Sequence, residues 1–143
     1  MTPSQKLDRI YYSKGYKYQL TKDYSATTRI RPDHVIDTRY IELHPDGKLT
    51  IRLGYAWDGA SGPTFDTKTC LRGSCGHDAK YQLIRMGLIQ YSSAKAIADD
   101  ELYEDLVEDG MWKWRAKIWH KIVSTFGRNS LSPSDERPVL IAP

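Results

Sequence analysis

The spacing of apolar residues changes near residue 66, and this change constrains the fold more than any other feature. Before it, β-branched and aromatic residues come in short runs over residues 16–20, 38–43 and 48–53. The last two runs alternate with a period of two, as half-buried strands do. After residue 70 apolar residues recur at helical spacing. The pattern therefore predicts an α+β fold, with an N-terminal antiparallel β region of hairpins packed against two or three C-terminal helices.

Turn and cap residues refine these predictions. His44-Pro45-Asp46-Gly47 separates the two alternating runs and predicts a hairpin, because glycine accepts the positive φ that such a turn needs. Helices are expected over about residues 73–86, 93–109 and 112–126. Gly127 is expected to end the last of them.

The chain of 143 residues is long enough for one domain spanning residues 1–143. We expect a β-rich part over about 10–66, a helical part over about 70–127 and an extended, proline-containing tail over 128–143. No apolar run is long enough for a transmembrane segment, and the N-terminal residues lack the apolar core of a secretory signal. A cytoplasmic protein with Cys70 and Cys75 as free thiols is expected.

Charge is distributed unevenly in the second half of the chain. The net charge of +3 is too small to predict nucleic-acid binding. Residues 99–109 hold seven acids and no base, whereas residues 111–128 hold five bases and no acid. One interpretation is that two neighbouring helices attract each other. The other is that Trp112, Trp114 and Trp119 lie among these bases on a surface for anionic lipid or a partner.

A histidine and an aspartate fall on the apolar faces of two successive predicted helices. His77 shares its face with Tyr81, Ile84 and Leu88. Asp99 shares a stripe with Leu102, Tyr103 and Leu106, whereas Asp100 is turned away. A buried carboxylate needs a partner, and helices joined by a short loop run antiparallel with such faces together. His77 is therefore the expected partner of Asp99.

A lone histidine on an apolar face is more often a core residue than a catalyst. Here Asp78 is adjacent, Asp99 faces it and Tyr81 follows one turn later. Polar groups that converge inside a small domain need a reason, which favours a functional site.

These residues carry a resemblance. His77-Asp78-x-x-Tyr81, followed by Asp99 and Tyr103, resembles the two-helix core of the small secreted calcium-dependent phospholipases that cleave the sn-2 ester. A second resemblance is carried by Asp58-Gly59-Ala60-Ser61-x-Pro63, His77-Asp78-x-x-Tyr81, Ala98-Asp99 and a closing aromatic helix that ends in Phe126-Gly127. This set is similar to a family of small domains encoded by tailed bacteriophages and prophages. The resemblance covers roughly residues 53–127.

The resemblance implies a role for each position. His77 would be the general base that activates water, and Asp99 would hold its imidazole. Tyr81 and Tyr103 would brace the carboxylate by hydrogen bonds. A calcium ion would be held by Asp78 together with the loop at Asp58 and Gly59, and would stabilise an oxyanion.

Two functions follow as alternatives. The first is a phage-encoded ester hydrolase, made in the host cytoplasm and acting on a lipid or other ester at an envelope surface. The second is a non-enzymatic component of the phage virion, such as a tail or baseplate protein that contacts other phage structural proteins. In that case the cluster around His77 would only lock two helices together.

Overall fold

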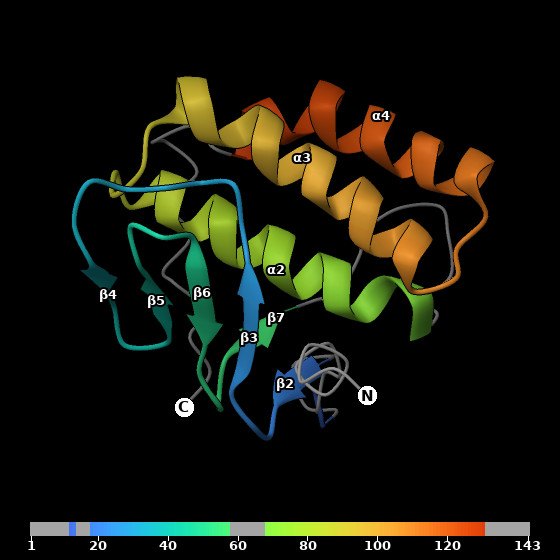
Figure 1. Ribbon diagram of the computed structural model, residues 1–143. Helices are drawn as coiled ribbons and strands as arrows, with labels where there is room; N and C mark the ends of the chain where they lie inside the picture. Colours follow the sequence, from blue (N-terminus) through green and yellow to red (C-terminus); the bar gives the residue numbers. More distant parts are fainter. Residues whose placement is uncertain (1–11, 14–17, 58–67, 131–143) are drawn as a thin grey trace.

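Three helices stacked on antiparallel strands make up the described part of the protein (Figure 1). The computed structural model describes residues 12–13, 18–57 and 68–130. This architecture confirms the predicted α+β class. No helix in these ranges is both long and apolar enough to cross a membrane.

The strands form two small sheets in which every pairing is antiparallel. One sheet has the order β1-β2-β7 and the other the order β3-β6-β5-β4. The strands are β1 (Tyr12–Ser13), β2 (Tyr18–Leu20), β3 (Tyr24–Thr27), β4 (Ile36–Asp37), β5 (Ile41–Leu43), β6 (Lys48–Ile51) and β7 (Ala56–Trp57).

The predicted hairpin is the pair β5–β6. Ile41 lies opposite Ile51 and Leu43 opposite Leu49, and all four side chains are fully buried. Their alternation with less buried neighbours confirms the period of two. The turn between the strands ends at Gly47, which has a φ of 90° as the turn chemistry predicts.

The helices are α2 (Lys68–Arg85), α3 (Tyr91–Glu108) and α4 (Lys113–Ser130). The start of α2 lies earlier than predicted, since burial of Cys70 and Leu71 holds a segment of weak helix propensity in helical form. The prediction that Gly127 ends the last helix is wrong, because an interior glycine costs a helix only about 1 kcal/mol.

Gly87 ends α2 with a φ of 73°, and the amides of Gly87 and Leu88 bond back to the carbonyls of Ile84 and Leu83. Leu88 therefore lies beyond the helix, 39% exposed, and does not share the face of His77 as predicted.

The core has two parts that meet along α3. The larger cluster joins both sheets to α2 and to the first half of α3. The smaller one, which includes Leu102, Leu106 and Trp119, joins α2 and α3 to α4. Figure 1 shows α4 as the outermost layer, on the far side of α2 and α3 from the strands. Cys70 and Cys75 are buried, and neither is in a disulfide, as expected.

Candidate functional site

The candidate site is built around Asp99, a carboxylate with only 2% of its surface exposed. Its Oδ1 atom accepts hydrogen bonds from His77 Nε2 at 2.8 Å and from the Tyr81 hydroxyl at 2.5 Å. Its Oδ2 atom accepts one from Lys95 Nζ at 2.7 Å. The structure therefore brings together His77, Tyr81 and Asp99, which the sequence analysis placed on facing helices.

Helical spacing explains how these donors converge. His77 and Tyr81 are one turn apart on α2, with ring centroids separated by 4.0 Å, so both point at the same carboxylate oxygen. Lys95 precedes Asp99 by four residues on α3 and lies beside it for the same reason.

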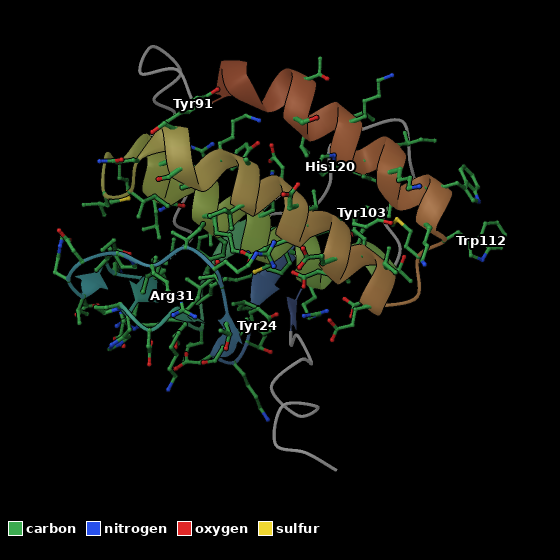
Figure 2. The ribbon with its side chains drawn as sticks, turned by 45° about the horizontal axis from the view of Figure 1, so that its top comes forward. Tyr24, Arg31, Tyr91, Tyr103, Trp112 and His120 are labelled. Atoms are coloured by element: carbon green, nitrogen blue, oxygen red, sulfur yellow. The ribbon has the colours of Figure 1, made fainter. Side chains whose placement is uncertain are left out.

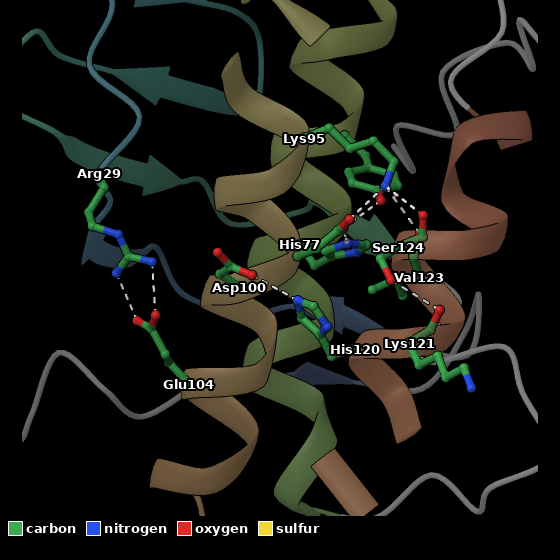
Figure 3. A network of polar contacts seen from close by, with 11 residues as sticks. Arg29, His77, Lys95, Asp100, Glu104, His120, Lys121, Val123 and Ser124 are labelled. Atoms are coloured by element: carbon green, nitrogen blue, oxygen red, sulfur yellow. Dashed lines mark hydrogen bonds and ion pairs between the residues drawn. The ribbon is translucent and has the colours of Figure 1, made fainter. Parts of the chain in front are cut away.

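Lys95 also connects the site to the third helix. Its ammonium group lies 3.4 Å from the backbone carbonyl oxygens of Val123 and Ser124 on α4 (Figure 3). The sequence analysis did not include Lys95 among the site residues. The signal that could have found it is the i, i+4 spacing of a lysine and an aspartate on one face.

The protonation states of the cluster follow from burial and from these contacts. Burial lowers the pKa of His77, and the hydrogen bond to Asp99 opposes this only in part. Burial acts to raise the pKa of Asp99, but hydrogen bonds from His77, Lys95 and Tyr81 hold it below its ordinary value. Burial and the adjacent Asp99 carboxylate raise the pKa of Tyr81. At neutral pH the site thus holds a neutral imidazole, a carboxylate and a phenol.

The tautomer of His77 follows from its partner. An ionised carboxylate can only accept hydrogen bonds, so Nε2 of the neutral ring carries the proton that faces Asp99. The lone pair is then on Nδ1. His77 keeps 11% of its side chain exposed. The ring is therefore oriented as a base whose accepting atom lies on the side away from Asp99.

Asp78 lies next to His77 in sequence but takes part in a different contact. Its Oδ2 atom accepts a hydrogen bond from the hydroxyl of Tyr55, whose side chain is completely buried. Burial and the Asp78 charge raise the pKa of Tyr55, so this hydroxyl stays protonated as a donor.

Of the predicted calcium ligands, Asp78 lies in the described part of the chain. Asp58 and Gly59 lie outside the described residues. Within the described ranges, no cluster of three His, Cys, Asp or Glu side chains could hold a metal ion. Asp78 by itself does not fit the shell of 6–8 oxygens that calcium takes. Calcium binding stays a prediction.

Tyr103 is not brought to Asp99. Its ring lies edge-on to His120 of α4, with centroids 6.3 Å apart. His120 in turn bonds through Nε2 to Asp100 Oδ1 at 2.7 Å. Tyr103 follows Asp99 by four residues, which turns it about 40° further round the helix, toward α4 rather than α2. The tyrosine hydroxyl that donates a hydrogen bond to Asp99 is that of Tyr81.

Most acids of the acidic segment of α3 pair with basic residues of α2 or of the strand region. Arg72 Nε lies 3.0 Å from Asp109, and Lys80 Nζ lies 2.9 Å from Glu101. Glu101 also accepts hydrogen bonds from the Thr28 hydroxyl and from the Arg29 amide. Glu101 and Asp109, two of the acids expected to attract α4, thus form ion pairs with α2. Asp100 pairs with His120, and this ion pair joins α3 to α4.

A groove between α3 and α4 reaches the carboxylate from the side of Lys95. It has a volume of about 260 Å³ and opens to solvent. Its walls are Tyr91, Ser92, Lys95, Ala96, Asp99, Asp100, His120 and Ser124. Figure 2 shows Tyr91 at one end of the helical layer and His120 near its middle. Asp99 is therefore held between His77 on α2 and a hollow on the α4 side.

Comparisons of the chain with protein-family models, with curated proteins and with solved structures found no match.

Proposed function

We propose that the protein is an ester hydrolase in which His77 removes a proton from water and Asp99 holds the imidazole. The observation that carries the proposal is the 2.8 Å contact between His77 Nε2 and Asp99 Oδ1, because it leaves the lone pair of the ring on Nδ1. Asp99 also has its second oxygen held by Lys95, so the carboxylate is fixed on both sides. A base positioned in this way contributes typically 10²–10⁴-fold to a rate.

In the proposed reaction His77 first accepts a proton from water and then donates it to the leaving alkoxide. A water molecule gives a proton to Nδ1 while its oxygen adds to the carbonyl carbon of the ester. The resulting imidazolium is stabilised by Asp99. The proton then passes from Nδ1 to the alkoxide oxygen as the carbon–oxygen bond breaks, which releases a carboxylic acid and an alcohol and restores the neutral ring.

The lowered pKa of His77 suits this role. A base must be unprotonated to act, and burial keeps the ring unprotonated to lower pH than an exposed histidine. We therefore expect the rate to persist below about pH 6.5, the ordinary pKa of histidine.

The resemblance of the motifs supports two finer parts of the proposal. One is a phage-encoded protein, made in the host cytoplasm, whose substrate is a lipid or another ester of the cell envelope. The other is a calcium ion held by Asp78 with the loop at Asp58 and Gly59, which when bound would stabilise the oxyanion. A raised thermal midpoint in calcium, reversed by a chelator and absent in Asp78→Asn, would support the ion; an unchanged midpoint would remove it from the proposal.

The proposed base is tested by comparing two histidines. We expect His77→Gln to lower the rate of hydrolysis of short-chain and phospholipid esters by about 10²-fold or more. His120→Gln is the matched control, because His120 also pairs with an aspartate of α3 but lies 37% exposed on the far side of that helix. Equal activity of the two variants would contradict the proposal.

The alternative is a non-enzymatic virion component that contacts other phage structural proteins. The observation that favours it is Lys95, which ties Asp99 on α3 to two carbonyl groups of α4 and makes the cluster a link among three helices. In that case no ester would be hydrolysed, and His77→Gln would lower the urea midpoint of unfolding strongly.

A further inference from the structure

Two tryptophans stand exposed at the start of α4. Trp112 is 70% exposed and Trp114 is 59% exposed, and their ring centroids are 6.0 Å apart. Ile118, one turn after Trp114, is 45% exposed. Figure 2 shows Trp112 projecting from the end of the helical layer. Three large apolar side chains thus share one outer surface, and an exposed apolar patch rimmed by polar residues marks an interaction site.

Three lysines flank this apolar patch. Lys113, Lys117 and Lys121 follow one another at intervals of four residues, so they form a stripe along the outer side of α4. All three are exposed. None of the described carboxylates forms an ion pair with them, although the acids of α3 are only one helix away. The inner side of the helix is occupied by Ala116 and Trp119, which are buried.

We infer that this outer face of α4, formed by Trp112, Trp114, Ile118, Lys113, Lys117 and Lys121, docks on an anionic phospholipid bilayer. Indole rings are favoured at the boundary between headgroups and acyl chains, because they have an apolar body and a polar N–H. The lysine stripe would lie along the layer of anionic headgroups. The inference rests on the proposed function in one respect: the bilayer would hold the ester substrate of the hydrolase.

Charge and position on the molecule favour lipid as the occupant. The segment 111–125 has no acidic residue, so nothing on α4 repels an anionic surface. Because α4 is the outermost layer, a flat membrane can approach it without meeting the sheets (Figure 1). The patch is a convex helix surface, and a bilayer accepts a convex surface without a matching pocket.

The test measures binding to vesicles of phosphatidylglycerol mixed with phosphatidylcholine, and to vesicles of phosphatidylcholine alone. Binding is followed by co-sedimentation and by tryptophan emission. Trp57 and Trp119 are each 4% exposed, so a blue shift on binding reports Trp112 and Trp114. We expect the wild type to bind the mixed vesicles with a blue shift and to bind phosphatidylcholine weakly.

Matched variants separate the patch from the net charge. Replacing Lys113, Lys117 and Lys121 by Gln changes the net charge from +3 to 0, and replacing Lys22, Arg31 and Lys48 by Gln changes it equally. The latter three are exposed in the strand region (Figure 2 labels Arg31). We expect affinity for the mixed vesicles to fall on the order of 100-fold in the first variant, and by less than about threefold in the second.

The apolar part of the patch has its own control. The double variant Trp112→Ala/Trp114→Ala should lose the blue shift and most of the binding. Leu53→Ala removes a residue that is 61% exposed between β6 and β7, and should bind as the wild type does.

Several outcomes would overturn the inference. These are equal binding to both vesicle types, an equal loss in the two triple variants, or a wild-type dimer that the tryptophan variant dissociates. The last result would identify a protein interface instead.

His77→Gln should bind vesicles like the wild type. If the wild type does not bind the mixed vesicles but hydrolyses a soluble ester, this inference alone is overturned. If the wild type binds the vesicles but hydrolyses no ester, only the proposed hydrolase is overturned.

Discussion

Asp99 shows how a charge is kept inside a small domain. The carboxylate is 2% exposed, yet its two oxygens receive three donors from two helices. An isolated buried carboxylate would be protonated, but these contacts hold the pKa of Asp99 below its ordinary value. The folded protein thus stabilises the ionised form of Asp99 more than its neutral form.

The two tyrosines of the motif provide a test at the scale of the residue. Tyr81→Phe removes a donor from a buried carboxylate, so we expect the free energy of unfolding to fall by about 2 kcal/mol. Tyr103→Phe makes the same chemical change at a hydroxyl that does not reach Asp99, and should cost less than about 0.5 kcal/mol. Urea unfolding of both variants measures the difference. Equal losses would show that the two hydroxyls support the carboxylate alike.

Much of the site was predictable at this scale, and the physical reason is the helical period. The positions of His77, Tyr81 and Asp99 on their wheels were sufficient to choose Asp99 over Asp100 as the partner of His77. The same period misplaced Tyr103, because a rotation of about 40° decides which neighbouring helix a side chain meets. The helical period of a sequence does not show which neighbouring helix lies on which side of α3.

At the scale of the element, turn chemistry was more reliable than helix ends. The β5–β6 hairpin was predicted from alternation and from Gly47, and both signals are local. The ends of α2 and α4 depend on what they pack against, which the sequence does not show.

Gly47 should be far less tolerant of a side chain than Gly87, although both have positive φ. A Cβ atom on Gly47 would lie 2.3 Å from the carbonyl oxygen of Thr28, whereas none of the described atoms lies within 4 Å of one on Gly87. We expect Gly87→Ala to cost about 1–2 kcal/mol for the left-handed backbone alone, and Gly47→Ala to cost clearly more. Thermal or urea unfolding compares them. Similar losses would mean that the Thr28 segment moves away freely.

At the scale of the whole molecule, buried groups make stability depend on pH. Because the pKa of His77 is lowered on folding, mainly by burial, the unfolded chain takes up this proton at a higher pH than the folded chain does. Stability is therefore lost as pH falls from about 6.5 through the folded pKa. Asp105 acts in the opposite sense, since burial raises its pKa to about 6. Its contribution is present at low pH and is lost as pH rises through about 6.

The two effects can be separated with variants. In the Asp105→Asn background we expect the urea midpoint to fall as pH is lowered from about 7.5 to about 5. Adding His77→Gln should flatten this slope, because glutamine does not titrate. Asp99 ionises only at lower pH and leaves this window unaffected. An unchanged slope in the double variant would show that His77 is not the titrating group.

The contact between Thr28 and Glu101 has a consequence for the order of folding. Its two partners are separated by 73 residues, so the bond can form only after most of the described chain has been brought into a closed loop. The hairpin and the helices can form from local contacts. The strand region contacts α3 only after these local structures have formed. We therefore expect the rate-limiting event to be the docking of the two halves, with local structure preceding it in time.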